Sequence, residues 1–155
     1  MYVLLRQLHD LRRAIDLPPP SARGSLALRH VDAGSCNGCE HELNAVAGPF
    51  YDLAQYGLNV VASPRHADVL LVTGPVTTRM AQALQRAYDA MPAPRLVAAL
   101  GDCALGCNVL GAARELAGPL EDLLPVSVRI PGCPPTPQVI AEHLLAAMTG
   151  QPVAS

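Results

Sequence analysis

The sequence predicts an α/β domain in which a parallel sheet carries helices on both faces. Short apolar segments that have the composition of buried strands alternate with segments of helical periodicity. Half of the 155 residues are hydrophobic and 15% are charged, which suffices for one domain with its own core. We divide the chain into an N-terminal helix with a proline-rich linker, residues 1–24, and a main domain, residues 25–150.

The N-terminal segment is expected to form an amphipathic helix over residues 2–16, ended by the prolines at 18–20. Such a helix needs a surface that covers its apolar stripe. The segment therefore either folds back on its own domain or contacts a neighbouring subunit or a membrane surface. The stripe consists of Leu4, Leu5, Leu8, Leu11 and Ile15.

The main domain is expected to contain five strands, each apolar and bounded by turn residues. The third is almost wholly apolar and is followed by Gly74 and Pro75, as a strand buried on both faces would be. The expected strands cover residues 26–31, 59–62, 67–72, 96–100 and 126–130.

Three helices are expected between or after these strands. The second begins near Thr77 and Thr78, whose hydroxyl groups are suited to cap a helix N-terminus. The expected helices cover residues 39–47, 78–91 and 136–148. The inward face of the second helix is expected to carry Met80, Ala83, Leu84 and Ala87.

Four cysteines beside glycines form the most specific pattern of the chain. One C-x2-C pair is followed by two single cysteines, and the set is Cys36, Cys39, Cys103 and Cys133. Strands that end near residues 31, 100 and 130 lead directly into them. Because ligands of parallel sheets lie beyond the carboxyl ends of the strands, we expect the four thiols to meet at one edge. Four thiolates are the ligands of a [4Fe–4S] cluster or of a tetrahedral metal ion.

Other uses of these cysteines stay open. Structural zinc sites usually draw on two close pairs, and this chain has one, so the spacing favours a cluster over a zinc-stabilised interaction domain. Buried free thiols are a third interpretation. Cys107 competes with Cys103 as the third ligand, and we prefer Cys103 because it follows the end of its strand directly.

Composition and motifs exclude several classes of function. The net charge of −2 gives no reason to expect a nucleic-acid partner, and the chain has no G-x-G-x-x-G fingerprint for a nicotinamide cofactor. No apolar run reaches 18 residues, and no signal peptide is visible, so we expect a cytoplasmic location.

Three segments together resemble one protein family. Residues 34–40 (GSCNGCE), 101–104 (GDCA) and 131–137 (PGCPPTP) resemble the small subunit of NiFe hydrogenases of the energy-converting, formate-hydrogenlyase type. That protein is related to the 20 kDa subunit of complex I. The resemblance covers roughly residues 25–149. It implies a flavodoxin-like iron–sulfur domain with one [4Fe–4S] cluster on Cys36, Cys39, Cys103 and Cys133.

The resemblance also implies a role and partners. The chain would be an electron-transfer subunit of an oxidoreductase, without catalysis of its own, and the cluster would be the one proximal to the NiFe centre. Its partners would be a hydrogenase large subunit or a complex I-like counterpart, further iron–sulfur subunits and membrane subunits on the inner face of the cell membrane. A complex I-type quinone-reducing module is the alternative. The 20 kDa protein of such modules typically has two adjacent cysteines, and the C-x2-C pair here favours the hydrogenase branch.

Two glutamates follow the cysteine pair. The resemblance suggests an acid here that helps protons move toward the large subunit, with Glu42 preferred to Glu40. The alternative is that both are acids of the first helical turn, which the helix dipole favours.

Overall fold

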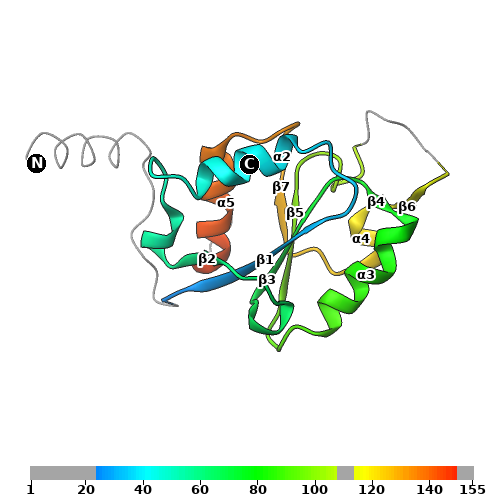
Figure 1. The fold of residues 1–155 in the computed structure, drawn as a ribbon, viewed down its shortest axis with the longest axis horizontal. Helices are drawn as coiled ribbons and strands as arrows, with labels where there is room; N and C mark the ends of the chain where they lie inside the picture. The colour runs from blue at the N-terminus through cyan, green and yellow to red at the C-terminus, as the bar shows by residue number, and fades with distance from the viewer. Residues whose placement is uncertain (1–23, 108–113, 150–155) are drawn as a thin grey trace, which may run out of the picture.

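A five-stranded parallel sheet forms the centre of the computed structural model, which describes residues 24–107 and 114–149 (Figure 1). The strand order is β2-β1-β3-β5-β7, and each neighbouring pair is parallel. Counted along these five strands the order is 2-1-3-4-5, the flavodoxin-like arrangement. The strands are β1 (Leu26–Asp32), β2 (Leu58–Val60), β3 (Val69–Thr73), β5 (Leu96–Leu100) and β7 (Val128–Ile130).

Helices cover both faces of this sheet, which confirms the predicted fold class. Helices α2 (Gly38–Val46) and α5 (Pro137–Thr149) pack on one face, and α3 (Thr78–Asp89) and α4 (Leu120–Leu123) pack on the other. None of the helices in the described part of the chain has the length and apolar character needed to cross a bilayer. The helix expected over residues 2–16 and the proline-rich linker lie outside the described residues.

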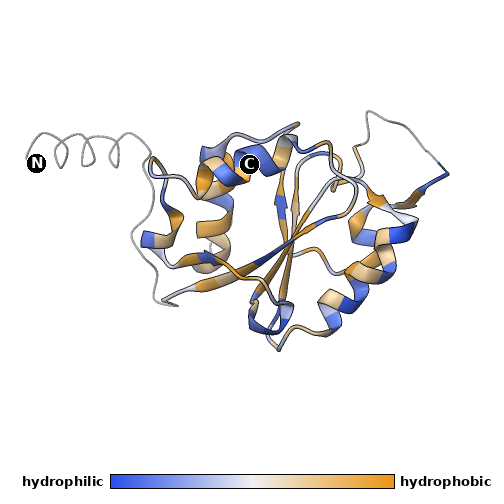
Figure 2. Cartoon of the chain, in the orientation of Figure 1, coloured by the Kyte–Doolittle hydropathy of each residue, from blue (hydrophilic) through white to orange (hydrophobic). Residues whose placement is uncertain are grey.

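Strand β3 shows why the predicted strands are continuously apolar. Its side chains alternate between the two faces: Val69 and Leu71 join the core under α2 and α5, whereas Leu70 and Val72 join the core under α3 and α4. All four are fully buried. Both faces of a central parallel strand are covered by helices, so its residues do not alternate between apolar and polar. Figure 2 shows the apolar strands between helices whose outer sides are hydrophilic.

Several short elements were not expected from the sequence. A second sheet pairs β4 (Val76–Thr77) with β6 (Leu116–Gly118) in antiparallel register, and two 3₁₀ helices, η1 (Leu53–Tyr56) and η2 (Pro64–His66), flank β2. Elements of two to four residues are too short to show a hydrophobic period.

Helix α3 confirms the predicted cap and corrects one predicted core residue. The Thr77 hydroxyl accepts a hydrogen bond from the Met80 N–H at 3.4 Å. Leu84 is buried, but Ala83 is exposed, so its predicted inward position was wrong. Each residue advances about 100° around a helix, and the buried stripe is centred on Leu84, which turns Ala83 toward solvent.

Candidate metal centre

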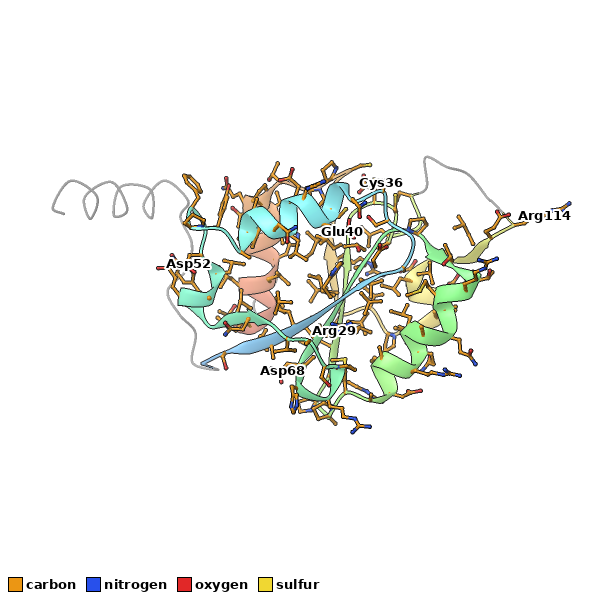
Figure 3. The ribbon with its side chains drawn as sticks, viewed as in Figure 1. Arg29, Cys36, Glu40, Asp52, Asp68 and Arg114 are labelled. Carbon is orange, nitrogen blue, oxygen red and sulfur yellow. The ribbon has the colours of Figure 1, made fainter. Side chains whose placement is uncertain are left out.

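The predicted cysteines lie at the carboxyl edge of the sheet, in loops that follow three different strands. Cys36 follows β1, and Cys39 lies in the first turn of α2. Cys103 and Cys133 come shortly after the ends of β5 and β7. Figure 3 shows Cys36 beyond the strand ends, near the start of α2. Parallel strands bring segments that are remote in the sequence to one edge.

The four thiols are close enough to act on one another electrostatically. Burial raises the pKa of the Cys39 thiol to about 12, and Glu40 and the thiols of Cys103, Cys36 and Cys133 add to the effect. Burial also raises the pKa of Cys103, with further contributions led by Cys133 and then Cys36. Because like charges disfavour ionisation, four thiolates at this edge require a positively charged group among them.

Cys107 stands apart from these four. It is exposed, and it is not among the thiols that shift the pKa of Cys39 or Cys103. Its backbone N–H donates to the Asp102 carbonyl at 2.9 Å, which closes the turn after β5. This position supports the choice of Cys103 as the third member of the group.

Asp32 shapes the loop that carries the cysteine pair. Its carboxylate oxygen Oδ1 accepts hydrogen bonds from the N–H groups of Gly34, at 2.8 Å, and Ser35, at 2.7 Å. Aspartate commonly holds a turn in this way by bonding to backbone a few residues ahead. The chain is thereby turned back over the sheet edge before it reaches Cys36.

Asp102 joins the other two cysteine loops. Its Oδ1 accepts from the Gly132 N–H at 2.7 Å, and its own N–H donates to the Gly132 carbonyl at 2.9 Å. Two hydrogen bonds between the same pair of residues fix the loop after β5 against the loop after β7. Cys103 and Cys133, the next residues of each loop, are held at a set separation as a result.

Two glycines allow the loops to approach closely. Gly101 has φ +88°, and a Cβ atom there would lie 2.6 Å from the Cys39 sulfur. Gly74, at the end of β3, has φ +74°, and a Cβ there would lie 2.4 Å from the Ser35 nitrogen. Because β3 lies between β1 and β5, its exit must leave room for the first cysteine loop, and only glycine does so without a clash.

A partly buried polar network lies beside the cysteine pair and is centred on Glu40. Ser35 Oγ donates to Glu40 Oε2 at 2.7 Å, and the hydroxyl of Thr73 donates to Oε1. Thr73 is fully buried, and His30 Nε2 lies 2.9 Å from its oxygen. Since the single Thr73 hydrogen is directed to Glu40, His30 must carry its proton on Nε2 and donate to Thr73.

The network keeps Glu40 ionised. Burial by itself would raise the pKa of this carboxyl, but the hydrogen bonds from Ser35 and Thr73 outweigh it and the pKa lies below its usual value. Burial lowers the pKa of His30, although Glu40 and Asp32 oppose that effect. The centre therefore has a carboxylate of fixed orientation beside Cys39.

Glu42, the preferred acid of the sequence analysis, lies elsewhere. It is half-buried on α2, and with the described residues its side chain makes no hydrogen bond or ion pair. Sequence reasoning also missed Thr73, Asp32 and Asp102 as supports of the site. The Asp-x-Gly pattern at residues 32–34 is a turn signal that could have identified Asp32. Nothing local identifies Thr73, which gains its role from the pairing of β3 with β1.

The donor set consists of four cysteine thiols, a ligand type and number that suit both a [4Fe–4S] cluster and tetrahedral zinc. Among residues 24–107 and 114–149, no three His, Cys, Asp or Glu side chains are grouped as a ready-made site for one metal ion. Tetrahedral zinc needs every sulfur at about 2.3 Å from the metal. Four cysteine thiols on glycine-rich loops, drawn toward one another from three strand ends, provide the ligand type and number that [4Fe–4S] clusters use.

The sequence of the domain matches a known family. Residues 36–147 match the family described as NADH ubiquinone oxidoreductase, 20 Kd subunit. This match begins at Cys36 and contains all four cysteines.

Curated relatives share more than two fifths of the aligned residues. The chain is 43% identical over 119 residues to the probable membrane-bound hydrogenase subunit mbhJ of Pyrococcus furiosus, covering 77% of this chain and 71% of that protein. It is 43% identical over 107 residues to formate hydrogenlyase subunit 7 of Escherichia coli, covering 69% of this chain and 42% of that protein.

Solved structures share the fold. A chain of the membrane-bound sulfane sulfur reductase, an archaeal respiratory membrane complex, superposes with a TM-score of 0.69 at 28% identity, over 81% of this chain and 71% of that one. A chain of an NAD⁺-reducing [NiFe]-hydrogenase superposes with a TM-score of 0.66 at 18% identity, over 84% of this chain and 95% of that one. At that identity the second similarity shows the fold alone.

Proposed function

Because the chain belongs to the family of the 20 kDa subunit of NADH ubiquinone oxidoreductase, we propose that it is an electron-transfer subunit with one [4Fe–4S] cluster. The host would be a multisubunit oxidoreductase of the NiFe-hydrogenase type, in which this cluster is the proximal one. The observation that carries the proposal is the meeting of four thiols from three strand ends at one edge of the sheet.

In this proposal the protein holds, orients and shields its cofactor. Cys36, Cys39, Cys103 and Cys133 are the ligands, and the cluster supplies one-electron redox chemistry when bound. The Asp102–Gly132 hydrogen bonds hold two of the ligand loops in register. Gly101 leaves space for the Cys39 sulfur. The chain would perform no catalysis alone.

The proposed partners follow from the exposure of the site. Cys36 and Cys133 are exposed, so a cluster held by them would face a neighbouring subunit. We assign that place to a large catalytic subunit, with further iron–sulfur subunits to carry single electrons onward. The relative named as a probable membrane-bound hydrogenase subunit and the membrane-bound respiratory complex among the solved structures support membrane partners. We assign the chain a peripheral place on the inner face of the cell membrane.

A complex I-type quinone-reducing module is the second candidate, and the description of the matched family favours it. The C-x2-C spacing of Cys36 and Cys39 favours the hydrogenase type instead. Metal analysis of the intact complex separates the two. Stoichiometric nickel in the large partner supports a hydrogenase, and a large partner without nickel supports the quinone-reducing module.

A proton path through the glutamates remains a prediction. Glu40 is the better supported of the two, because it is ionised and held by Ser35 and Thr73 beside Cys39. Glu42 has no such support among the described residues.

Cysteine variants of the complex, purified without oxygen, test the ligand set. We expect about four iron and four sulfide per chain beyond those of the partner subunits, and an EPR signal of this cluster after reduction with dithionite. Cys36→Ser and Cys133→Ser should each abolish the signal because each removes a ligand thiolate.

Cys107→Ser is the matched control and should keep both the iron and the signal. Stoichiometric zinc without iron would reject the cluster in favour of a zinc-stabilised domain. Loss of the signal in Cys107→Ser, together with its retention in Cys103→Ser, would show that the third ligand is misassigned.

A further inference from the structure

An apolar hollow opens on the face of the sheet that carries α2, away from the cysteine loops. It has a volume of about 140 Å³ and is lined mainly by Leu28, Leu43, Val46, Leu53, Leu58 and Leu144. These side chains belong to the main core, so the hollow reaches into the interior. A dry cavity of about 150 Å³ accommodates a benzene-sized group. The hollow therefore has room for the side chain of one inserted leucine.

Apolar surface continues onto the rim of this hollow. Val60, which lines it, is 58% exposed on the edge strand β2. Phe50, in the turn between α2 and η1, is 49% exposed. They are the large hydrophobic side chains that stay exposed among the described residues. Val60 thus extends the apolar lining of the hollow onto the surface, and exposed apolar surface of this kind indicates a place that is covered by another apolar group.

The N-terminal segment joins the fold at the edge of the same hollow. The N–H of Leu26, the first residue of β1, donates to the Gly57 carbonyl at 2.8 Å. A Cβ on Gly57 would lie 2.3 Å from the carbonyl oxygen of Gly24, so the backbones touch there. Gly57 is followed by Leu58 and preceded by η1, both of which line the hollow. Gly24, the first described residue, thus lies within a few residues of the lining.

Length and charge of that segment suit the hollow. Residues 17–23 form a proline-rich linker that would reach about 20 Å when extended. This is ample for returning residues 2–16 to a hollow that borders the attachment point. Residues 1–23 contain four arginines and two aspartates, a net charge of +2, whereas the remaining chain is net negative. Figure 3 shows Asp52 at the turn that leads into η1, whose Leu53 and Ala54 line the hollow.

We propose that residues 2–16 dock on this hollow through the stripe of Leu4, Leu5, Leu8, Leu11 and Ile15, with one leucine inserted. A helix of this length is marginal by itself, so its formation would be coupled to the docking. The short linker keeps the local concentration of the segment in the millimolar range, which favours its own chain over a second molecule. The proposal is independent of the cofactor and of the host complex.

Amide hydrogen exchange of residues 2–16 in the full-length, cofactor-loaded chain tests the docking. We expect protection in the monomer, with exchange at least about tenfold slower than in the released segment. Leu8→Asp should remove the protection by placing a charge on the apolar stripe. Arg6→Asp, about 170° around the helix from the centre of the stripe, adds the same side chain and should keep it.

Matched substitutions in the main domain, at the hollow and away from it, complete the test. Ala54→Trp fills the hollow and should remove the protection, whereas Ala45→Trp, at an exposed position of α2, should keep it. A photoreactive benzoylphenylalanine at position 11 should cross-link within the same chain to peptides that contain Leu53, Ala54 or Val60. If position 11 cross-links to no peptide with one of these residues, the proposal is wrong. This result does not depend on whether the tryptophan variants fold.

Three outcomes assign the hollow to another occupant and overturn the proposal. Protection that increases with protein concentration indicates a second copy of the chain. Protection that arises only after the partner subunits are added indicates a contact within the complex. Protection that arises only with vesicles containing an anionic phospholipid indicates a membrane surface.

Discussion

At the scale of single residues, the site depends on the absence of a side chain at Gly101. The residue combines a left-handed backbone, φ +88°, with a neighbouring sulfur, that of Cys39, at the place a Cβ would occupy. Either feature favours glycine, but they have different consequences. A side chain in this backbone conformation would lower the stability of the fold. A side chain beside the sulfur would displace Cys39, a proposed ligand.

Gly101→Ala, compared with Gly24→Ala, separates these consequences. Both glycines have left-handed φ, +88° and +80°, so both changes should cost about 1–2 kcal/mol of backbone strain. At Gly24 no atom lies within 4 Å of the added Cβ, whereas at Gly101 the Cys39 sulfur must move. We expect Gly101→Ala to lose most of its iron, measured per chain after anaerobic purification, and Gly24→Ala to retain it. Equal iron contents would show that Cys39 does not need this space.

At the scale of elements, the start of α3 depends on one hydroxyl. Thr77 lies at the N-cap and accepts from the Met80 N–H, and Thr78 is the exposed first residue of the helix. A cap satisfies a backbone donor that has no partner inside the helix. Of the two adjacent threonines, Thr77 is the one whose hydroxyl serves as the cap.

Thr77→Ala should destabilise the protein by about 1 kcal/mol, because it leaves that donor without its side-chain acceptor. Thr78→Ala should change the stability by less than about 0.5 kcal/mol, as exposed positions usually do. Denaturant unfolding of both variants beside the parent protein measures the difference. A larger loss of stability for Thr78→Ala than for Thr77→Ala would mean that the helix begins one residue later than described.

The sequence around an element decides whether it could be predicted. All five strands of the main sheet, including the short β2 and β7, and the three longer helices were predicted within a few residues, because each lies in an apolar or helix-periodic segment bounded by turn residues. The β4–β6 pair and α4 were not, since they depend on contacts across the fold. The predicted inward position of Ala83 was wrong because periodicity locates a stripe only to within about one residue.

At the scale of the whole molecule, the cysteine edge is the place where three remote loops meet. Two of these loops are joined by the Asp102–Gly132 hydrogen bonds, and the third is held by Glu40, which accepts from Ser35 and Thr73. A group bound by all four thiols would add links among the same loops. A group that binds the folded chain but not the unfolded chain stabilises the fold by mass action.

Removal of iron by a chelator, without oxygen, should therefore loosen one edge of the molecule. We expect faster amide exchange in residues 33–39, 101–107 and 131–135 of the iron-free chain than in the loaded chain. The C-terminal half of helix α3, residues 84–89, lies beside the turn that leads into β5 and serves as the internal control, with unchanged exchange. Unchanged exchange in the three loops would place the bound iron elsewhere.

The site shows what sequence could predict and what it could not. The four cysteines and their common edge were predicted, because thiols are rare, chemically specific and located after predicted strands. The placement of Glu40 over Thr73, and the hydrogen bond from His30 to Thr73, were not, because they depend on residues 33 and 43 positions apart in the chain. Glu40 and Glu42 also lie two residues apart on one helix, and only the tertiary structure shows which of the two reaches Ser35 and Thr73.

By itself, the sequence determined the class of the fold and the four cysteines that we propose as ligands, since apolar patterning and cysteine spacing are local properties of the chain. Only the tertiary structure decided which carboxylate lies beside the cysteines, which glycines must stay without a side chain, and where an apolar hollow stays open. Those features depend on the separation of atoms from different strands, and that separation is set when the sheet aligns them.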